Sequence, residues 1–485
     1  MIKRSVFTAI GLVLAVLVAS AQEDPLTKLN YPEDLREDLA IVRQTLEQAH
    51  PDPYRYRSKA ELDRMFDDIA SSFTVPLSAE EFIQATLPAF RVIGDAGTVL
   101  MPPVGLRTAY EHSEPLLPIT VSVIGGRMYL NEELKGFRSL PTACEILQIN
   151  ERPAAQVLAK LRSAQVPEGA DTTLLDRRIE QDFPVLYRRH VERADKFVIA
   201  YRTAVGAVGE KELFALTKDE MRQTYKPKGY DLLPWRLEEF PGDRSAWLTL
   251  GTMDPAELER QRIAPERFLN SVLDALRKGD ASTLVIDVRG ASGNDLGVAE
   301  QVFSLIGQVP YRVVKSMSIR SGRVPDSYRY ATPAPEFFAS VGGMYMPEAK
   351  GRRELKPDDP RLAPVLPLSK AFQGKVYVVC DGLTTGAAAA FVMMAKRTGR
   401  ARTVGEELGS NASSFCGGKV LELTLPRSGC VLHVPLTRYV PEGTPVGPAD
   451  RGEMPNYRVP QRAVDLAQGK DTVRDALLNL IGEMR

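Results

Sequence analysis

Two continuous apolar runs in the second half of the chain set the strongest limit on its fold. They read TLVIDVRG at residues 283–290 and KVYVVCDG at residues 375–382, and a helical pattern follows each of them. A third strand-like run, ARTVGEE, begins at residue 401. Apolar strands that alternate with helices are typical of a parallel sheet covered on both faces. We therefore predict an α/β core over residues 229–485.

The carboxyl ends of parallel strands meet at one edge of the sheet, where ligand sites of such folds lie. This rule brings residues 289–295, 382–387 and 405–414 together around one crevice. Residues 309–370, rich in proline and polar residues, are expected to leave the core as an excursion. The runs KVLELTL and CVLHVPL flank residues 426–429 and predict a hairpin.

Residues 22–105 are predicted to form a helical domain. The first helix has apolar residues at helical spacing, namely Leu35, Leu39, Val42 and Leu46. It should end near His50, because Pro51 disfavours its continuation, and His50 is expected to pack or cap there. Ser58 with Glu61, and Ser78 with Glu81, have the spacing of capping boxes and predict the starts of two more helices.

Residues 106–228 show a different pattern of short alternating strands. These are LPITVSVI, RMYL, CEILQIN and KFVIAYRT, with a helical run at residues 154–161 among them. Several short strands with a helix are typical of a small β-rich, PDZ-like module. Modules of that class bind an extended peptide by adding it to a sheet edge.

The first 21 residues have the pattern of a secretory signal peptide. Lys3 and Arg4 precede an apolar run from Val6 to Val18, and residues 19–21 read Ala-Ser-Ala. The run is shorter than the roughly 20 residues that span a bilayer, so no transmembrane anchor is expected after cleavage. We predict a periplasmic or secreted protein.

Composition narrows the choice of partners. Basic and acidic residues both number 62, so the chain has no net positive charge that would attract nucleic acid. The four histidines are scattered without ligand spacing, so neither a metal nor another cofactor is expected. Cys144 and Cys380 lie in apolar runs as buried thiols, whereas Cys416 and Cys430 could form a disulfide in an oxidising compartment.

The order of these segments resembles the tail-specific, or C-terminal-processing, serine peptidases, whose core is similar to the ClpP/crotonase fold. The likeness extends over nearly the whole mature chain. It is most specific in the core, where residues 287–290 read Asp-Val-Arg-Gly, residues 384–388 read Thr-Thr-Gly-Ala-Ala, and Gly405-Glu406 follows at the family spacing. The resemblance implies a fold of helical segment, PDZ-like module and α/β core, with peptide or unfolded protein segments as partners.

The same resemblance implies that the catalytic side chains are missing. Gly386 stands where the family has its nucleophilic serine, at the start of a helix whose amides stabilise an oxyanion. Gly97, in Asp-Ala-Gly-Thr at residues 95–98, stands where some members have a histidine base. Asn411 stands where others have a lysine base. Loss of a nucleophile alone typically costs on the order of 10⁶ in turnover.

The oxyanion turn is altered too, because Ala291 and Asn294 replace family asparagine and glycine. Gly290, Gly293 and the amide of Ala387 are nevertheless candidates to bind a peptide carbonyl or carboxylate. The sequence thus predicts an exported, catalytically degenerate homologue that still binds peptide. One alternative is an active serine-type endopeptidase with a substitute nucleophile, for which the candidates are Thr384, Thr385 and Ser410. The other alternative is an envelope scaffold without a working groove.

Overall fold

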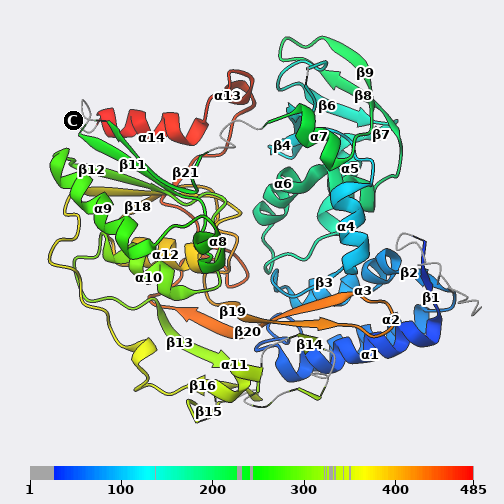
Figure 1. Cartoon of the computed structure of the whole chain (residues 1–485), viewed down its shortest axis with the longest axis horizontal. Coiled ribbons are helices and arrows are strands. Elements are labelled where there is room, and N and C mark those ends of the chain that lie inside the picture. The colour runs from blue at the N-terminus through cyan, green and yellow to red at the C-terminus, as the bar shows by residue number, and fades with distance from the viewer. Residues whose placement is uncertain are drawn as a thin grey trace, which may run out of the picture.

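The structure is a computed structural model that describes residues 27–483 except 137, 227–231, 241–243, 322, 324, 327–330, 333–334, 342 and 349–350. The predicted signal peptide, residues 1–21, lies outside the described residues. The chain forms two halves that lie side by side (Figure 1). One is an α/β core, and the other combines the N-terminal helices with a small sheet.

The core sheet has the parallel strands that the apolar runs predict. Its order is β10 (Trp235–Phe240), β11 (Ser245–Leu250), β12 (Thr283–Asp287), β17 (Lys375–Cys380), β18 (Arg402–Gly405) and β21 (Tyr457–Arg458). All neighbours are parallel except β10, which pairs with β11 in the antiparallel sense. The mixed α/β fold predicted from the sequence is thus confirmed.

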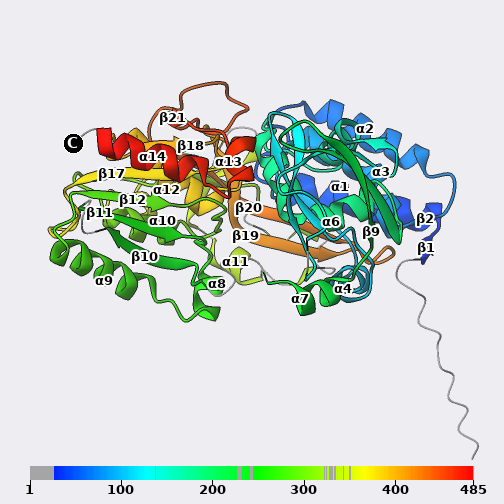
Figure 2. The same cartoon turned by 90° about the horizontal axis from the view of Figure 1, so that it is seen from above.

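Helices cover both faces of this sheet, which explains why its strands are apolar throughout. The helices of the core are α8 (Pro255–Arg260), α9 (Pro265–Lys278), α10 (Leu296–Ser304), α12 (Gly386–Arg397), α13 (Ala463–Ala467) and α14 (Thr472–Glu483). In β12, Leu284 and Ile286 pack with α9, α10 and α12, whereas Val285 packs with α14. Successive side chains of a strand point to opposite faces. Figure 2 shows α9 and α14 on opposite sides of the sheet.

The N-terminal helices begin and end where the sequence signals predict. They are α1 (Pro32–Ala49), α2 (Lys59–Ser72) and α3 (Ala79–Ile93), with the short strands β1 (Leu29–Asn30) and β2 (Leu77–Ser78) beside them. His50 is the C-cap of α1, and both predicted capping boxes are formed. Gly94 ends α3 in the left-handed conformation, with φ of 65°.

A long hairpin joins the two halves. It consists of β19 (Phe415–Thr424) and β20 (Val431–Pro441), as the sequence predicts. Its tip packs into the apolar cluster of α1, α2 and α3 through Leu423, Leu432 and Val434, and β20 pairs there with β3 (Val99–Met101). The N-terminal helices therefore share their core with a segment from the end of the chain.

The hairpin is also the centre of a second sheet. Besides β3, the other strands are β13 (Val314–Ile319), β14 (Ala331–Thr332), β15 (Tyr345–Pro347) and β16 (Arg353–Leu355). In sequence, α11 (Pro335–Ser340) lies between β14 and β15, and the 3₁₀ turn η4 (Pro360–Leu362) follows β16. The excursion predicted for residues 309–370 thus leaves the core sheet and adds these four strands to the sheet of the hairpin.

The small sheet of the N-terminal half contains the predicted short strands. The segment that forms this sheet and the helices beside it has, in sequence, α4 (Val104–His112), β4 (Ile119–Ile124), β5 (Arg127–Glu133), β6 (Glu145–Ile149), β7 (Arg152–Pro153), α5 (Ala154–Ser163), α6 (Thr173–His190), β8 (Lys196–Arg202), β9 (Val208–Phe214) and α7 (Lys218–Thr224). The strand order is β4-β5-β6-β8-β9, so β4 and β9 are the edges. Its PDZ-like character stays a prediction.

The four cysteines are free thiols, and Cys144, Cys380 and Cys430 are buried. Cys416 lies opposite Arg438 near the base of the hairpin, whereas Cys430 lies at its tip, next to the first residue of β20. The register of the two strands keeps these sulfurs apart. The disulfide considered for Cys416 and Cys430 is therefore not formed.

Candidate functional site

Gly386 lies at the first turn of α12, just beyond the carboxyl end of β17. Its φ is 55°, in the left-handed region that L-residues with a side chain rarely adopt. A Cβ atom at this position would lie 2.2 Å from the carbonyl oxygen of Gly293. The same oxygen accepts a hydrogen bond of 2.8 Å from the amide of Ala387. Backbone therefore fills the space where a nucleophilic side chain would begin.

The turn at residues 290–294 is held by hydrogen bonds on both sides. Met253 donates its amide to the Ser292 carbonyl at 2.7 Å, and Thr385 donates to Ala291 at 3.0 Å. The amide of Gly290 donates to Oδ1 of Asp381 at 3.0 Å. Two of the three candidate oxyanion donors, the amides of Gly290 and Ala387, are thus already used within the chain.

Two of the three hydroxyl groups considered as substitute nucleophiles have structural partners. Thr384 is fully buried, and its Oγ1 donates to the Val288 carbonyl at 2.9 Å while accepting the Asp381 amide at 3.0 Å. Oγ of Ser410 accepts the amide of Gly386 at 2.9 Å. Thr385 is the N-cap of α12 but makes no side-chain capping bond. In the described part of the chain, none of the three hydroxyls is hydrogen-bonded to a histidine or lysine that could act as a base.

Asn411, at the predicted lysine position, connects three segments. Its side-chain amide donates to the Tyr56 hydroxyl at 3.1 Å and to the Ala449 carbonyl at 2.8 Å. Its Oδ1 accepts the amide of Ser413 at 2.8 Å. The side chain is fully buried, so it fixes the loop after β18 and faces no solvent-filled site.

Gly97, at the predicted histidine position, lies between the end of α3 and the hairpin. A Cβ there would lie 3.0 Å from Cγ of Pro435 in β20. Across the hairpin, a Cβ at Gly417 would lie 4.0 Å from Oδ1 of Asn294, the residue after the one that approaches Gly386. The hairpin β19–β20 thus has one contact beside Gly97 and another beside the turn that approaches Gly386.

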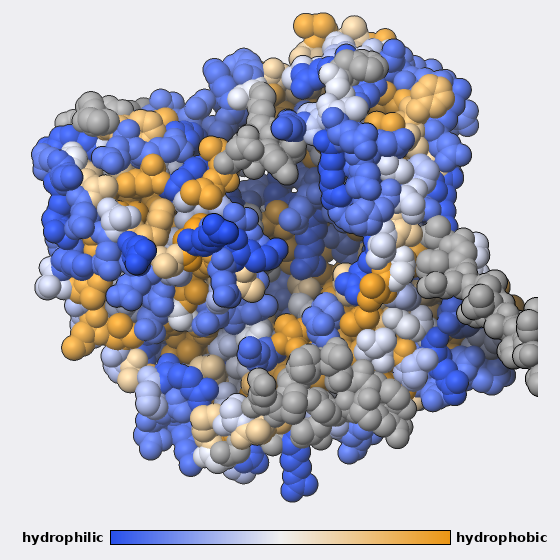
Figure 3. All heavy atoms as spheres, viewed as in Figure 1, coloured by the Kyte–Doolittle hydropathy of each residue, from blue (hydrophilic) through white to orange (hydrophobic). Residues whose placement is uncertain are grey.

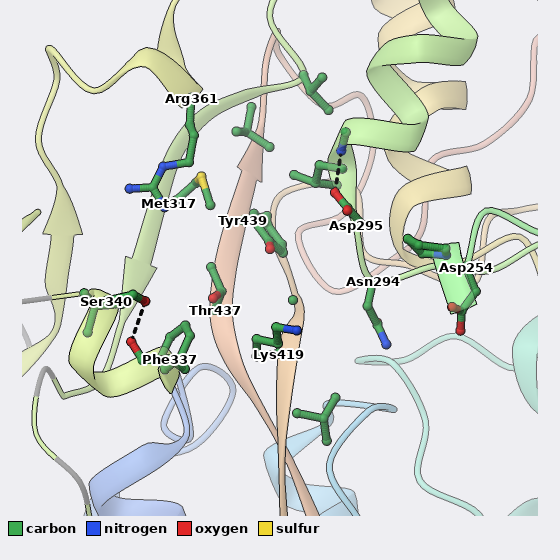
Figure 4. Close-up of a pocket in the computed structure, with 18 of the residues that line it drawn as sticks. Asp254, Asn294, Asp295, Met317, Phe337, Ser340, Arg361, Lys419, Thr437 and Tyr439 are labelled. Carbon is green, nitrogen blue, oxygen red and sulfur yellow. Dashed lines mark hydrogen bonds between the residues drawn. The ribbon is translucent and has the colours of Figure 1, made fainter. Parts of the chain in front are cut away.

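A cavity of about 830 Å³ opens beside the turn at residues 290–294. Asn294, Asp295 and Asp254 lie along one side of it, and Met317, Phe337 and Ser340 lie along the other (Figure 4). Tyr439, Thr437 and Lys419 lie between them on the hairpin. The molecule is also visibly hollowed between its two halves in the space-filling view (Figure 3). Of the residues predicted to meet around one crevice, only Asn294 and Asp295 line this cavity. Its other walls come from segments that the prediction did not include.

Residues 250–444 match the model of peptidase family S41. This segment, the S41 domain, is similar to the peptidases of that family. The crystal structure of mature CPAF is similar in fold, with a TM-score of 0.64 at 14% identity over 93% of this chain and 98% of that one. A complex of mature CPAF with lactacystin aligns with a TM-score of 0.62 at 13% identity, with the same coverage. The photosystem II D1 C-terminal processing protease aligns at 0.42, with 13% identity over 91% and 98%.

No curated protein sequence is significantly similar to this chain. The S41 match and the CPAF fold confirm the resemblance drawn from the core motifs. Within the described residues, no helix combines the length and apolar character needed to cross a membrane.

Beside the S41 domain, a buried pair that the sequence did not reveal lies next to Gly97. Nε2 of His50 is 2.9 Å from Oδ2 of Asp95, and Nδ1 of His50 accepts the amide of Asp52 at 3.0 Å. Burial raises the pKa of the Asp95 carboxyl, but hydrogen bonds from His50, Thr98 and Gly97 outweigh it and leave the pKa below its ordinary value. The two residues are 45 positions apart, and only the fold brings them together.

Cys416 lies close to this pair, and the ligand atoms of His50, Asp95 and Cys416 are all within 4.8 Å of one another. The chemistry of the set does not suit a metal. Because Nδ1 of His50 accepts a backbone amide, the proton of the neutral ring is on Nε2, which donates to Asp95. Burial and the charge of Asp95 raise the pKa of the Cys416 thiol well above its usual value, which disfavours a thiolate ligand.

The edge strand β4, one of the two edges to which a peptide could add, is partly occupied by α6. Gly125 and Gly126 form the two-residue turn between Ile124 and Arg127, so the backbone groups of Val123 point away from β5. The amide of Val123 donates to Oε1 of Glu180 at 2.5 Å, and its carbonyl accepts from Nη2 of Arg177 at 2.8 Å. Two side chains thus hold the bonds that an added strand would make at this residue.

Proposed function

We propose that this protein is an exported S41 homologue that binds peptide or unfolded protein segments without hydrolysing them. The basic start, apolar run and Ala-Ser-Ala of residues 1–21 support export to the periplasm or the medium. Membership of the S41 family supports a polypeptide ligand. The cavity beside the turn at residues 290–294 supports retained binding.

The observation that carries the proposal is the position of the Gly293 carbonyl against Gly386. Its oxygen lies 2.2 Å from where a Cβ would be, and this lack of room for a side chain supports the absence of a nucleophile at the family position. The family positions for a base carry Gly97, which has no side chain, and Asn411, whose amide is not basic. Neither residue can accept a proton from a nucleophile.

An active endopeptidase that uses Thr384, Thr385 or Ser410 is the competing function. It would require a base beside one of these hydroxyls, and the contacts of Thr384 and Ser410 with backbone groups argue against it. A scaffold without a working groove is the third possibility, and the open cavity argues against it.

The test is a cleavage and labelling assay on the protein that begins after residue 21. We expect no hydrolysis of casein by mass spectrometry and no labelling by a fluorophosphonate probe, because no activated hydroxyl is present. The Gly386→Ser variant is expected to remain inactive, because no base lies at the family positions and because the Gly293 carbonyl occupies the space of the new side chain.

Thr384→Val and Ser410→Ala serve as matched variants. If the wild-type protein cleaves casein and one of these two variants does not, the non-hydrolytic proposal is wrong and that hydroxyl is the nucleophile. Binding without cleavage in the same samples supports it.

A further inference from the structure

The cavity beside residues 290–294 has two chemically different walls. The apolar wall comes from β13, α11, β15 and the hairpin, and its main members are Val314, Met317, Phe337, Val341, Tyr345 and Tyr439. The whole cavity, at about 830 Å³, is as large as a typical small-ligand pocket and can hold more than one side chain of a peptide. An apolar side chain would lose contact with water along this wall.

The opposite wall is acidic. It contains Asp254 and Asp295, at the starts of α8 and α10, together with Glu300 from the next turn of α10. Figure 4 shows Asp254 and Asp295 on the same side of the cavity. A single oxygen of each aspartate caps its helix, at 2.8 Å from the amide of Ala256 or Gly297. The second oxygen of each remains available.

These carboxylates form no ion pair: within the described residues, none of Asp254, Asp295 and Glu300 is in a salt bridge. Two basic residues line the cavity. Arg361 is already held by Asp359 through two bonds of 2.8 Å, and Lys419, on the hairpin, is one cation against three carboxylates. Burial raises the pKa of Glu300, as expected for a carboxylate without a cationic partner. The wall therefore has an excess of negative charge.

We propose that this cavity binds an extended peptide through a lysine or arginine side chain next to an apolar residue. The cation lies against Asp254 and Asp295, and the apolar side chain lies against Met317 and Phe337. The long aliphatic stem of lysine or arginine suits a cavity whose two walls differ in this way. Acidic peptide segments are rejected by the same carboxylates. The inference rests on the proposed peptide-binding function and specifies its ligand.

The position of Asn294 relates the cavity to the S41 site. Asn294 lines the cavity and follows Gly293, the residue that contacts Gly386. A peptide whose side chains enter the cavity would therefore pass beside the turn at residues 290–294, close to Gly386.

The experiment compares blocked pentapeptides by isothermal titration calorimetry on the protein that begins after residue 21. Their central residue is lysine, glutamine or glutamate between two leucines. We expect the lysine peptide to bind about tenfold more tightly than the glutamate peptide, with a difference that shrinks as salt is added. Equal affinities, or no binding of any of the three, overturn the assignment.

Two variants test the acidic wall without removing the helix caps. Asp254→Asn and Asp295→Asn together keep capping oxygens, because asparagine caps a helix as well as aspartate, but they remove the charge. We expect the preference for lysine over glutamate to fall to about twofold or less. Asp68→Asn, on the exposed face of α2, is the matched charge control and should change nothing.

Phe337→Ala tests the apolar wall and should weaken the lysine and glutamine peptides by the same factor. If the peptides still bind but neither the two aspartate substitutions nor Phe337→Ala changes their affinities, the peptide lies elsewhere. The cavity assignment is then wrong, while the proposed function stands. Mass spectrometry of each titrated sample reports hydrolysis, so cleavage would contradict the proposed function independently of where the peptide binds.

Discussion

At the scale of single residues, Gly386 is fixed by its surroundings in two independent ways. Its positive φ favours glycine, and the Gly293 carbonyl occupies the direction of a side chain. Backbone therefore occupies the space of a side chain at this position, and Gly386→Ser would disturb the turn at residues 290–294.

This close approach of the backbone predicts that Gly386→Ser destabilises the folded protein more than the same substitution at a glycine with free space around it. Gly399, at the other end of α12, also has a positive φ of 71°, but a Cβ there meets nothing within 4 Å. Urea unfolding should give a loss of about 1 kcal/mol for Gly399→Ser, from the backbone alone. Gly386→Ser should lose about 2 kcal/mol more, because of the overlap with Gly293. Equal losses would show that the turn moves freely aside.

At the scale of elements, the sequence predicted those helices and strands whose determining residues are neighbours in the chain. The apolar runs gave β12 and β17, and the serine–glutamate spacings gave the starts of α2 and α3. Helix α6 was missed, because its charged residues, the kink at Asp182 and Pro184 obscure the helical pattern. The bonds of its side chains to the edge of β4 depend on tertiary packing that no local pattern records.

The candidate site divides in the same way. The positions of Gly97 and Gly386 followed from family motifs, which are local in sequence. The contact of Gly386 with Gly293, the pairing of His50 with Asp95, and the cavity all arise where distant segments meet. Burial and close approach decide these features, and a single sequence contains neither.

The contact between α6 and β4 carries a prediction about pH. Burial raises the pKa of Glu180 to about 7, although Arg177 acts in the opposite direction. The folded protein therefore keeps a proton that the unfolded chain loses above its ordinary pKa of 4.5. The contribution of Glu180 to stability is full below about pH 4.5 and decreases as the pH rises to about 7.

Glu180→Gln should remove this part of the pH dependence while it keeps an acceptor for the Val123 amide. Urea unfolding between about pH 4.5 and 7.5 should give a flatter curve for the variant than for the wild type. The difference in slope is at most about 1.4 kcal/mol per pH unit. Glu259→Gln, at an exposed position of α8, is the control and should follow the wild type. Parallel curves for wild type and Glu180→Gln would contradict the assigned shift.

At the scale of the whole molecule, the hairpin β19–β20 makes the N-terminal helices depend on a segment from the end of the chain. Leu432 is fully buried among the residues of α1, α2 and α3, although it belongs to the S41 domain in sequence. Truncation of such a leucine typically costs about 2–5 kcal/mol. The loss should appear first in the helices, far from residue 432 along the chain.

Leu432→Ala is therefore expected to accelerate hydrogen exchange in α1 and α3 while β12 and β17 keep their protection. Mass spectrometry of exchanged peptides separates these segments. Leu366→Ala, at a position that is 72% exposed, is the matched control and should leave all four elements unchanged. Uniform acceleration through both halves would show that the hairpin couples them into a single unfolding unit.

The same hairpin sets a condition on biosynthesis. Chain growth proceeds from the N-terminus, so α1, α2 and α3 are synthesised long before residues 415–441. Until then the apolar faces that receive Leu423, Leu432 and Val434 have no partner. During that interval these faces are exposed binding surfaces for chaperones that hold unfolded chains.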